Sequence, residues 1–365
     1  MSTKNKIIKC KAAIAWEANK PLSIEEIEVS PPQKGEVRIK ALEGNNIQFP
    51  VILGHEGSGI VESVGEDVKD VIAGDYVIPT PLPQCRKCKI CLNPTGNVCE
   101  ELTFGNIRSA LMDDGKSRFN CKGKQIFHFI GLSTFSEYIV VRETAINPKA
   151  PLDKVCLIGC GVTTGYGAPF NSCIVTKGST VGIWGMGAIG LSMVLGCKAK
   201  GAEKIVGIDL NEERLKNAEK FGITDSINPN KLIDETKGIV DYVRKNYDGG
   251  FDFTFEATGN TKAMSEAMEC SKVSTGQTCI IGVTSEKVCF SVIDLLYGRT
   301  IRGCVVGGYK PRDAMPMLVE KYLKGELPLE KFIDWRFPLI QINEGIEHLK
   351  NSRGVRSVIS LACDK

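Results

Sequence analysis

A glycine-rich segment near the middle of the chain constrains the fold more than any other feature. Gly185-Met-Gly-Ala-Ile-Gly190 follows an apolar run at Thr180–Trp184, which is typical of a buried strand, and it opens a helical stretch that continues to about Lys200. A second predicted strand, Lys204–Asp209, comes next and ends on an acidic residue. A strand, a glycine-rich turn, a helix and a second strand in this order predict a βαβ unit with a right-handed crossover.

Strands and helices continue to alternate beyond this unit. Further strands are expected at Phe251–Ala257 and Thr278–Val283, and helices at Glu212–Phe221, Gly238–Lys245 and Lys262–Cys270. This alternation predicts an α/β fold built on a doubly wound parallel sheet.

The glycines and the acidic residue have separable roles in binding a dinucleotide. Gly185 permits a tight turn, Gly187 lets the backbone approach a pyrophosphate, and Gly190 allows close packing of helix and strand. Asp209 would accept hydrogen bonds from the adenosine ribose hydroxyls and repel a 2′-phosphate, which favours NAD over NADP. The alternative is a glycine-rich turn that binds no ligand.

A cluster of four cysteines is the second strong motif. Cys85-x2-Cys88-x2-Cys91-x7-Cys99 places four thiols within fifteen residues, which suits a closed, tetrahedral structural zinc site. An iron–sulfur cluster is the main rival, but the ferredoxin pattern expects its fourth cysteine after three residues, followed by proline. Here the gap is seven residues and Glu100 follows, so zinc is favoured over iron–sulfur and over four free thiols.

The two ends of the chain differ in pattern from the middle. A length of 365 residues suggests two domains or slightly more. The first part is rich in short β-type segments divided by glycine and proline, and the tail adds a helix at Asp313–Lys324 and a strand at Val358–Ala362. The early strands are expected at Gly35–Lys40, Gly59–Val64, Asp75–Pro79 and Phe135–Arg142. The tail is too short to stand alone, so we expect it to pack on the first domain.

Composition excludes several classes of partner. A formal net charge of +3 is too balanced to indicate nucleic acid or an anionic membrane surface. The chain contains no run of eighteen apolar residues and does not open with the apolar core of a signal peptide. The eleven cysteines outside the cluster read mostly as small buried residues that stay reduced, so a cytoplasmic protein is expected.

With these motifs in place, the chain resembles the zinc-dependent medium-chain alcohol dehydrogenases, and among them the dimeric animal classes. The resemblance implies a GroES-like, β-rich catalytic domain at 1–161 that is completed by 306–365, and a Rossmann NAD-binding domain at 162–305. It also implies a homodimer. Further segments that carry it are Ile8-Lys-Cys-Lys-Ala-Ala, Glu36-Val-Arg-Ile-Lys, Gly54-His-Glu-Gly, Cys121-Lys-Gly-Lys, Ser133-Thr-Phe-Ser, Val155-Cys-Leu-Ile-Gly-Cys-Gly, Gly165-Tyr-Gly and Gly354-Val-Arg-Ser.

The resemblance also implies a second, catalytic zinc, whose ligand set is incomplete in this chain. His55 matches the imidazole ligand and Cys160 the second thiolate, but the loop that should carry the first thiolate is replaced by a shorter one, 41–48, without Cys or His. The hydroxyl and histidine of the family's proton relay, and an arginine that helps to hold the pyrophosphate, are missing with it. Glu56 or Glu43 could replace the lost ligand, because zinc accepts carboxylate oxygen. A partly occupied site and an empty site are the alternatives.

Further residues are assigned by the same resemblance. Thr164 would pack on the nicotinamide, Arg214 would lie near the adenosine ribose and Arg356 would bind phosphate. Ile281, Val283 and Val306 would contact the carboxamide, although core packing explains these three equally well. The residues expected to line the substrate pocket are Pro81, Phe104, Phe129, Ile130 and Val283. His128 and His348 are given no role.

The leading interpretation is therefore an NAD-linked zinc alcohol dehydrogenase, which exchanges hydride between an alcohol or carbonyl compound and the nicotinamide. A metal-independent medium-chain reductase is one alternative, and a catalytically impaired NAD-binding variant is another, because the first catalytic thiolate is absent. The apolar run Thr300–Gly308 is predicted as an edge strand that could pair with a second copy of the chain.

Overall fold

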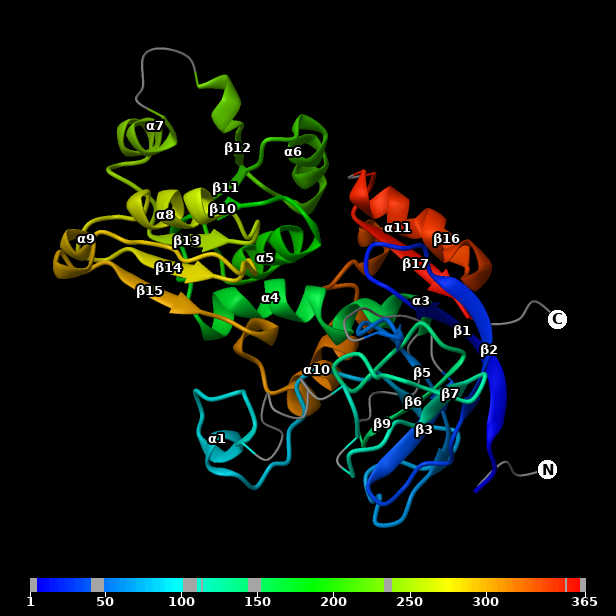
Figure 1. Ribbon diagram of the computed structural model, residues 1–365. Helices are drawn as coiled ribbons and strands as arrows, with labels where there is room; N and C mark the ends of the chain where they lie inside the picture. The colour runs from blue at the N-terminus through cyan, green and yellow to red at the C-terminus, as the bar shows by residue number, and fades with distance from the viewer. Residues whose placement is uncertain are drawn as a thin grey trace. The chain divides into compact units, whose positions relative to one another are not determined.

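The chain divides into two units, which are described separately (Figure 1). In the computed structural model the described residues are 5–40, 49–100, 110–112, 114–143, 152–232, 238–351 and 353–361. The first unit comprises Met1–Cys160 and Lys310–Lys365, and the second comprises Gly161–Tyr309. The predicted domain limits, 1–161 with 306–365 and 162–305, differ from this division chiefly at the second join.

A six-stranded parallel sheet forms the centre of the second unit, in the order β12-β11-β10-β13-β14-β15. The strands are β10 (Thr180–Trp184), β11 (Lys204–Ile208), β12 (Asp225–Ile227), β13 (Phe253–Glu256), β14 (Gln277–Ile280) and β15 (Thr300–Gly303). The chain passes from β10 to β11 on one side and resumes at β13 on the other. The topological switch point therefore lies between the carboxyl ends of β10 and β13, where open α/β sheets bind their ligands.

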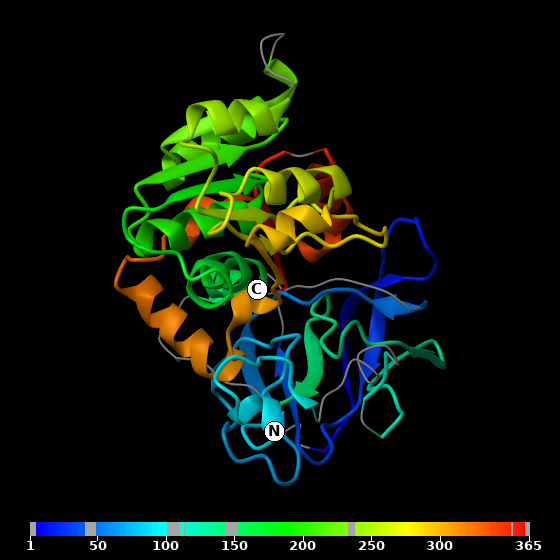
Figure 2. The same cartoon turned by 90° about the vertical axis from the view of Figure 1, so that its left-hand side faces the viewer.

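Helices cover both faces of this sheet (Figures 1 and 2). α5 packs on β10 and β11, whereas α8 packs on β10, β13 and β14. The helices of the unit are α4 (Gly161–Asn171), α5 (Ala188–Ala199), α6 (Glu212–Ala218), α7 (Ile239–Asn246), α8 (Thr261–Glu269) and α9 (Val292–Leu296). The predicted α/β fold with a doubly wound parallel sheet is confirmed.

The strand predicted over Thr300–Gly308 is wrong in its extent. β15 ends at Gly303, and a 3-10 turn, η5 (Val306–Gly308), follows it. Val306, Gly307 and Gly308 all have positive φ angles, of 49°, 62° and 68°, and left-handed residues cannot continue a strand. The amide Nδ2 of Asn171 donates a hydrogen bond of 2.9 Å to the Gly307 carbonyl, which fastens this turn to α4. The turn therefore belongs to the second unit, which ends just after it, at Tyr309.

The first unit contains most of its strands in two antiparallel sheets. One sheet has the order β4-β1-β2-β7-β8, the other has the order β6-β5-β3-β9, and a parallel pair, β16-β17, stands apart. The strands are β1 (Ile8–Ala15), β2 (Ser23–Val29), β3 (Glu36–Lys40), β4 (Val51–Ile52), β5 (Gly59–Val64), β6 (Tyr76–Val77), β7 (Phe119–Cys121), β8 (Lys124–Ile126), β9 (Tyr138–Arg142), β16 (Ile333–Pro338) and β17 (Arg356–Ser360). A β-rich first domain is what the early sequence pattern predicts.

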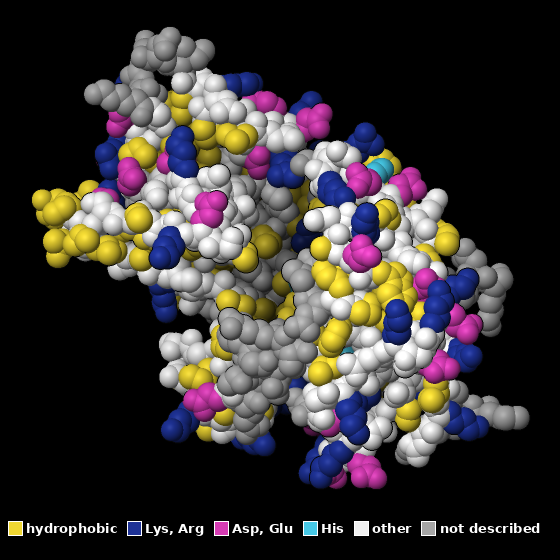
Figure 3. All heavy atoms as spheres, in the orientation of Figure 1, with side chains coloured by type: hydrophobic (Ala, Val, Ile, Leu, Met, Phe, Trp, Pro, Cys, Tyr) yellow, Lys and Arg dark blue, Asp and Glu magenta, His cyan; other side chains and the backbone are white. Residues whose placement is uncertain are grey.

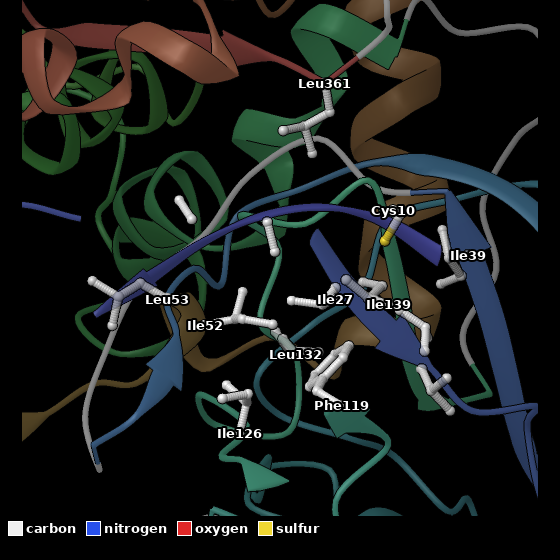
Figure 4. Packing of buried hydrophobic residues seen from close by; sticks show 14 of the residues in the cluster. Cys10, Ile27, Ile39, Ile52, Leu53, Phe119, Ile126, Leu132, Ile139 and Leu361 are labelled. Carbon is white, nitrogen blue, oxygen red and sulfur yellow. The ribbon is translucent and has the colours of Figure 1, made fainter. Parts of the chain in front are cut away.

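The inner faces of these strands form one hydrophobic core (Figure 4). Ile27, Ile39, Ile52 and Ile139 come from different strands and are completely buried. Burial of each such side chain contributes about 1.5–3 kcal/mol. Leu361 joins the same core from the far end of the chain, so the tail packs on the first unit as expected.

Short helices and turns complete the first unit. They are α1 (Lys89–Leu92), α3 (Leu152–Val155), η2 (Cys156–Gly159), α10 (Pro311–Leu323), η6 (Leu329–Phe332), η7 (Leu339–Gln341) and α11 (Ile342–Lys350). Two predicted strands are shorter in the structure, since the Asp75–Pro79 run keeps only β6 and the Phe135–Arg142 run begins at Tyr138. Among the described residues, no helix combines the length and apolar composition needed to cross a bilayer.

Candidate cofactor and metal sites

The glycine-rich turn lies at the carboxyl end of β10, beside the switch point. Gly185 has a φ angle of 95°, which favours glycine, and a Cβ at Gly190 would lie 1.8 Å from the Gly185 carbonyl oxygen. A Cβ at Gly187, in contrast, would meet no atom within 4 Å. The turn is therefore tight at its two outer glycines and open above the middle one, as the approach of a bound phosphate requires.

The helix that follows offers unpaired donors at the same place. Gly187 is the N-cap of α5 and supplies no side-chain hydrogen bond to the first turn. The backbone N–H groups at the start of a helix have no intrahelical partner, and the helix dipole adds a partial positive charge there. α5 is twelve residues long, so its N-terminus is suited to bind the phosphates of a dinucleotide.

Asp209 follows β11 and lies against the glycine-rich turn. Its carboxylate accepts hydrogen bonds from the backbone N–H of Met186 at 2.8 Å and of Asn211 at 2.9 Å. Arg214, in the first turns of α6, lies 4.0 Å from the same carboxylate. These contacts hold the Asp209 side chain beside the turn. A negatively charged hydrogen-bond acceptor at this point suits ribose hydroxyls and repels a 2′-phosphate.

The four clustered cysteines lie close together around α1. Their four Sγ atoms, from Cys85, Cys88, Cys91 and Cys99, all lie within 4.8 Å of one another. The Sγ atoms of Cys85 and Cys91 are 3.8 Å apart, as are those of Cys88 and Cys99. Tetrahedral coordination with a Zn–S bond of about 2.3 Å requires an S···S separation of about 3.8 Å. The cluster therefore fits a closed zinc site with no position left for chemistry.

Backbone N–H groups stabilise the thiolate form of Cys88. The Cys91 N–H donates to the Cys88 sulfur at 3.4 Å, and the Glu100 N–H donates to the same sulfur at 3.4 Å. The Cys88 N–H donates to the Cys85 sulfur at 3.3 Å. The bond from Cys91 is the largest of the effects that lower the pKa of Cys88 to about 6. Since the thiolate is the metal ligand, these bonds prepare the loop to bind an ion.

A contact that the sequence did not indicate holds this loop to α10. The ammonium group of Lys310 donates hydrogen bonds to the carbonyl oxygens of Cys91 at 2.6 Å and of Asn93 at 2.7 Å. Arg86, between the first two cysteines, forms a 2.7 Å ion pair with Asp313 in the first turn of α10. The partners are more than two hundred positions apart in the chain, so no local pattern could have revealed them.

Three potential metal ligands converge elsewhere in the first unit. A ligand atom from each of His55, Glu56 and Cys160 lies within 4.8 Å of the others. Tetrahedral zinc with these donors would require separations of about 3.3–3.7 Å, so small side-chain movements bring all three onto one ion. The structure thus places the two ligands expected from the sequence together with the carboxylate that could replace the third.

Local packing explains why these residues meet. Thr134 donates its hydroxyl hydrogen to the Glu56 carbonyl at 2.9 Å, which fixes the backbone beside His55. A Cβ at Gly159 would lie 3.6 Å from the Glu56 Cα, so the turn that carries Cys160 packs directly on this segment. Contacts of the backbone therefore bring the segment of His55 and Glu56 together with the turn that precedes Cys160.

The environment of His55 favours a neutral, ligating imidazole. Burial is the main reason that its pKa is lowered. The negative charge of Glu56 acts against this shift, and the positive charge of Arg356 adds to it. Its Nδ1 atom is buried and has no hydrogen-bond partner among the described residues. The ring packs edge-on against Phe129, with 5.8 Å between centroids. A neutral ring with an unmatched nitrogen is consistent with a metal-binding role.

Arg356, at the start of β17, contacts one of these potential ligands. Its Nε atom is 3.4 Å from the Glu56 carboxylate, and both side chains are largely buried. The resemblance assigned Arg356 to a phosphate and Glu56 to the metal. In the structure the two side chains bind each other.

The other expected cofactor residues lie in the second unit. Thr164, Ile281 and Val306 are almost completely buried, whereas Val283 is 93% exposed. Val306 holds a positive φ angle of 49°, which is strained for a β-branched residue, and such strain is common at functional sites. Their contacts with a nicotinamide stay predictions.

Of the expected substrate-pocket residues, Pro81 and Ile130 line a common small cavity in the first unit. Phe104 and the alternative metal ligand Glu43 lie outside the described residues. His128 is completely buried, and burial lowers its pKa to about 3. His348 packs between Trp335 and Phe337. Both histidines have packing roles and lie outside the clusters described above.

Two family models match the chain in the regions of these sites. One, described as alcohol dehydrogenase GroES-like domain, matches residues 33–151, and the other, described as zinc-binding dehydrogenase, matches residues 188–322. The first unit is therefore GroES-like in fold, and the second contains the nucleotide-binding sheet of this class of dehydrogenase.

Similar proteins match almost the whole chain. It is 45% identical to the class-3 alcohol dehydrogenase of Caenorhabditis elegans over 98% of both chains, and 46% identical to that of Drosophila melanogaster over 98% of this chain and 99% of the relative. A solved alcohol dehydrogenase zinc-binding domain protein from Burkholderia ambifaria is 31% identical, with a TM-score of 0.89 over 98% of this chain and 100% of the other. Benzyl alcohol dehydrogenase from Acinetobacter calcoaceticus is 29% identical, with a TM-score of 0.87 over 97% and 100%. The chain belongs to the zinc-dependent medium-chain alcohol dehydrogenase family.

Proposed function

We propose that this protein is a zinc-dependent alcohol dehydrogenase that transfers hydride reversibly between an alcohol, or the matching aldehyde or ketone, and NAD. The observation that carries the proposal is the convergence of His55, Glu56 and Cys160 in a chain that also keeps the complete glycine-rich dinucleotide turn. The names of the class-3 relatives support the same reaction class.

The residues of the second unit would bind and orient the dinucleotide. Gly187 and the first turn of α5 would hold the pyrophosphate, and Asp209 would hold the adenosine ribose. NAD supplies the hydride acceptor. Because Asp209 is fixed by Met186 on one side, its remaining acceptor sites have a defined direction, which supports selection of NAD over NADP.

The residues of the first unit would hold the metal and the substrate oxygen near it. A zinc ion supplies the Lewis acidity that favours loss of the alcohol proton. We propose that His55 and Cys160 are ligands and that Glu56 provides the third donor, in place of the thiolate that is absent from the sequence of 41–48. The C. elegans alignment spans 379 positions, more than the 365 residues of this chain, which supports a deletion relative to that enzyme.

Steady-state assays with matched variants test this function. Reduction of NAD by a primary alcohol should be measurable by absorbance and should fall at least a hundredfold in Cys160→Ala and in Glu56→Gln. Cys289→Ala is a suitable control, because this cysteine is exposed and lies in the second unit. Full activity in Cys160→Ala or in the presence of a strong chelator would favour the metal-independent reductase. Cofactor binding without turnover of any alcohol would favour the impaired variant.

We further propose a homodimer formed through β15 and α9. β15 is the edge strand of the parallel sheet, and its free edge can pair with the same strand of a second copy. Hydrophobic side chains gather over α9 (Figure 3), where Val292, Leu296 and Tyr297 are each more than 60% exposed. A patch of this kind on a single chain is typical of an interface.

Sedimentation of two variants tests the dimer. Leu296→Glu should shift the protein from dimer to monomer, whereas Leu349→Glu, at an exposed position on α11 of the other unit, should leave it dimeric. A wild-type monomer at micromolar concentration would contradict the proposal.

We also propose a cytoplasmic location. No disulfide joins the cysteines among the described residues, including the exposed Cys289, and disulfides are rare in that compartment. Cell fractionation that recovers the protein with secreted or organellar markers would contradict this location.

A further inference from the structure

We propose that Cys279 and Cys304 form a binding site for a soft, thiophilic cation of the Cu⁺ type. The two residues lie in the second unit, where Cys279 belongs to β14 and Cys304 follows the end of β15. Neither residue has a part in the function proposed above, so the inference stands or falls independently of it.

The pairing of β14 with β15 brings the two cysteines to one face of the parallel sheet. Cys279 lies opposite Arg302 in the register. The ladder continues beyond β15, since the Cys304 N–H donates a hydrogen bond of 3.2 Å to the Ile280 carbonyl. Cys304 is therefore two residues beyond the partner of Cys279. Side chains two residues apart point to the same face, so both sulfurs lie on one side of the sheet.

A third cysteine and further polar groups surround this pair. The Cys279 thiol is hydrogen-bonded to the thiols of Cys304 and of Cys173, which follows α4. The Ser172 hydroxyl is hydrogen-bonded to both sulfurs of the pair, and the Gly307 N–H donates to the Cys304 sulfur. Cys279 and Cys173 are completely buried, whereas Cys304 is partly exposed. An ion can thus reach the pair from the side of Cys304.

The same register favours a bridging ion over a disulfide between Cys279 and Cys304. Neighbouring strands are about 4.8 Å apart and each residue advances about 3.3 Å, so Cα atoms offset by two residues lie about 8 Å apart. A disulfide requires Cα atoms within about 6.8 Å and an S–S bond of about 2.05 Å. An ion with metal–sulfur bonds of about 2.3 Å accommodates sulfurs up to about 4.6 Å apart. The ion therefore fits without the backbone movement that a disulfide would need.

The protonation of the pair and the number of sulfurs select the type of cation. The hydrogen bond to Cys173 is the largest effect that raises the pKa of Cys279, and the hydrogen bond to Cys279 is the largest that raises the pKa of Cys304. Both sulfurs are thiols at rest, so binding of one ion releases two protons to the solvent. Thiolates select Cu⁺, which accepts two donors, whereas a structural zinc ion takes four. The copper stays monovalent, so the step needs no oxidant.

Copper content under competition tests this site. Zinc-loaded protein is equilibrated without oxygen in Cu⁺ buffered by bicinchoninate, and copper and zinc are then counted in the same sample. Wild type should retain one more copper ion per chain than Cys279→Ala or Cys304→Ala, with no loss of zinc. Cys173→Ala should bind this ion with an affinity about tenfold lower, because it removes only a hydrogen bond to a ligand. X-ray absorption of this copper should show two sulfur neighbours.

A buried cysteine elsewhere in the same unit provides the matched control. Cys197, in α5, is completely buried and lies outside this group, so Cys197→Ala should retain as much copper as wild type. Cooperative unfolding of each copper-free variant shows that it is folded, and Cys304→Ala, at the partly exposed position, provides a second test beside the buried Cys279→Ala. Cu⁺ should raise the melting temperature of wild type and leave that of Cys279→Ala unchanged.

Three results would overturn the proposal. The first is equal copper content in wild type and Cys279→Ala. The second is copper that enters wild type only as zinc is lost, which would place it at the zinc ligands. The third is a disulfide between Cys279 and Cys304, found by mass spectrometry in place of bound copper.

Discussion

Replacing Lys310 with methionine should loosen the four-cysteine loop while leaving its ligands intact. The Lys310 ammonium group donates hydrogen bonds of 2.6 and 2.7 Å to the carbonyls of Cys91 and Asn93. A hydrogen bond to a charged group contributes about 1.5–3 kcal/mol. Because both carbonyls are partly accessible to water after the change, we expect a combined loss of about 2 kcal/mol, which corresponds to about thirtyfold in an equilibrium constant.

The assay is the rate of zinc transfer from this loop to a coloured chelator. A Cys160→Ser background removes the second metal site from the signal, so that release reports only on the four cysteines. Lys310→Met should release zinc about thirtyfold faster than its parent. Lys324→Met, at the exposed carboxyl end of the same helix, is the matched control and should release zinc at the parental rate. An unchanged rate in Lys310→Met, or an equal acceleration in both variants, would refute the reasoning.

Three further predictions concern the cofactor site and pH. Gly190→Ala should lower the melting temperature and abolish NAD binding, because its Cβ would overlap the Gly185 carbonyl. Gly187→Ala should weaken NAD binding about tenfold and leave the melting temperature unchanged, because its methyl group enters open space. Asp209→Gly should raise the ratio of kcat/KM for NADP to that for NAD by at least tenfold, as measured with both cofactors. His128 is buried, and burial lowers its pKa to about 3. As the pH falls below about 6.5, the histidine is therefore protonated in the unfolded state but not in the folded state. The free energy of unfolding should fall between pH 6.5 and 3 by up to about 1.4 kcal/mol per pH unit. Urea unfolding of His128→Gln should show a correspondingly smaller pH dependence.

Those parts of the fold and of the sites that are formed by residues close together in the chain could be predicted from the sequence. The turn Gly185–Gly190 and the loop Cys85–Cys99 each carry their residue types, spacing and flanking pattern within a short segment. The alternation of strands and helices fixes the parallel sheet for the same reason, since each period is local. These elements appear in the structure with boundaries shifted by a few residues.

The parts that depend on distant residues could not be predicted. Arg356 and Glu56 are three hundred positions apart, and their ion pair exists only because β17 returns to the first unit. Lys310 and Cys91 are also distant in the chain, and their hydrogen bond forms because the start of α10 lies against the four-cysteine loop. The run Thr300–Gly308 has the apolar composition of a strand, but packing of Gly307 against α4 imposes a left-handed turn that composition does not reveal.

The central claim is that this chain holds two metal ions, one in the four-cysteine loop and one between His55, Glu56 and Cys160. Zinc content of the purified wild-type protein, measured by mass spectrometry alongside Cys160→Ser, tests it most directly. The account predicts two zinc ions per chain in wild type and one in Cys160→Ser. One zinc ion per chain in both proteins, even after dialysis against excess zinc, would contradict it.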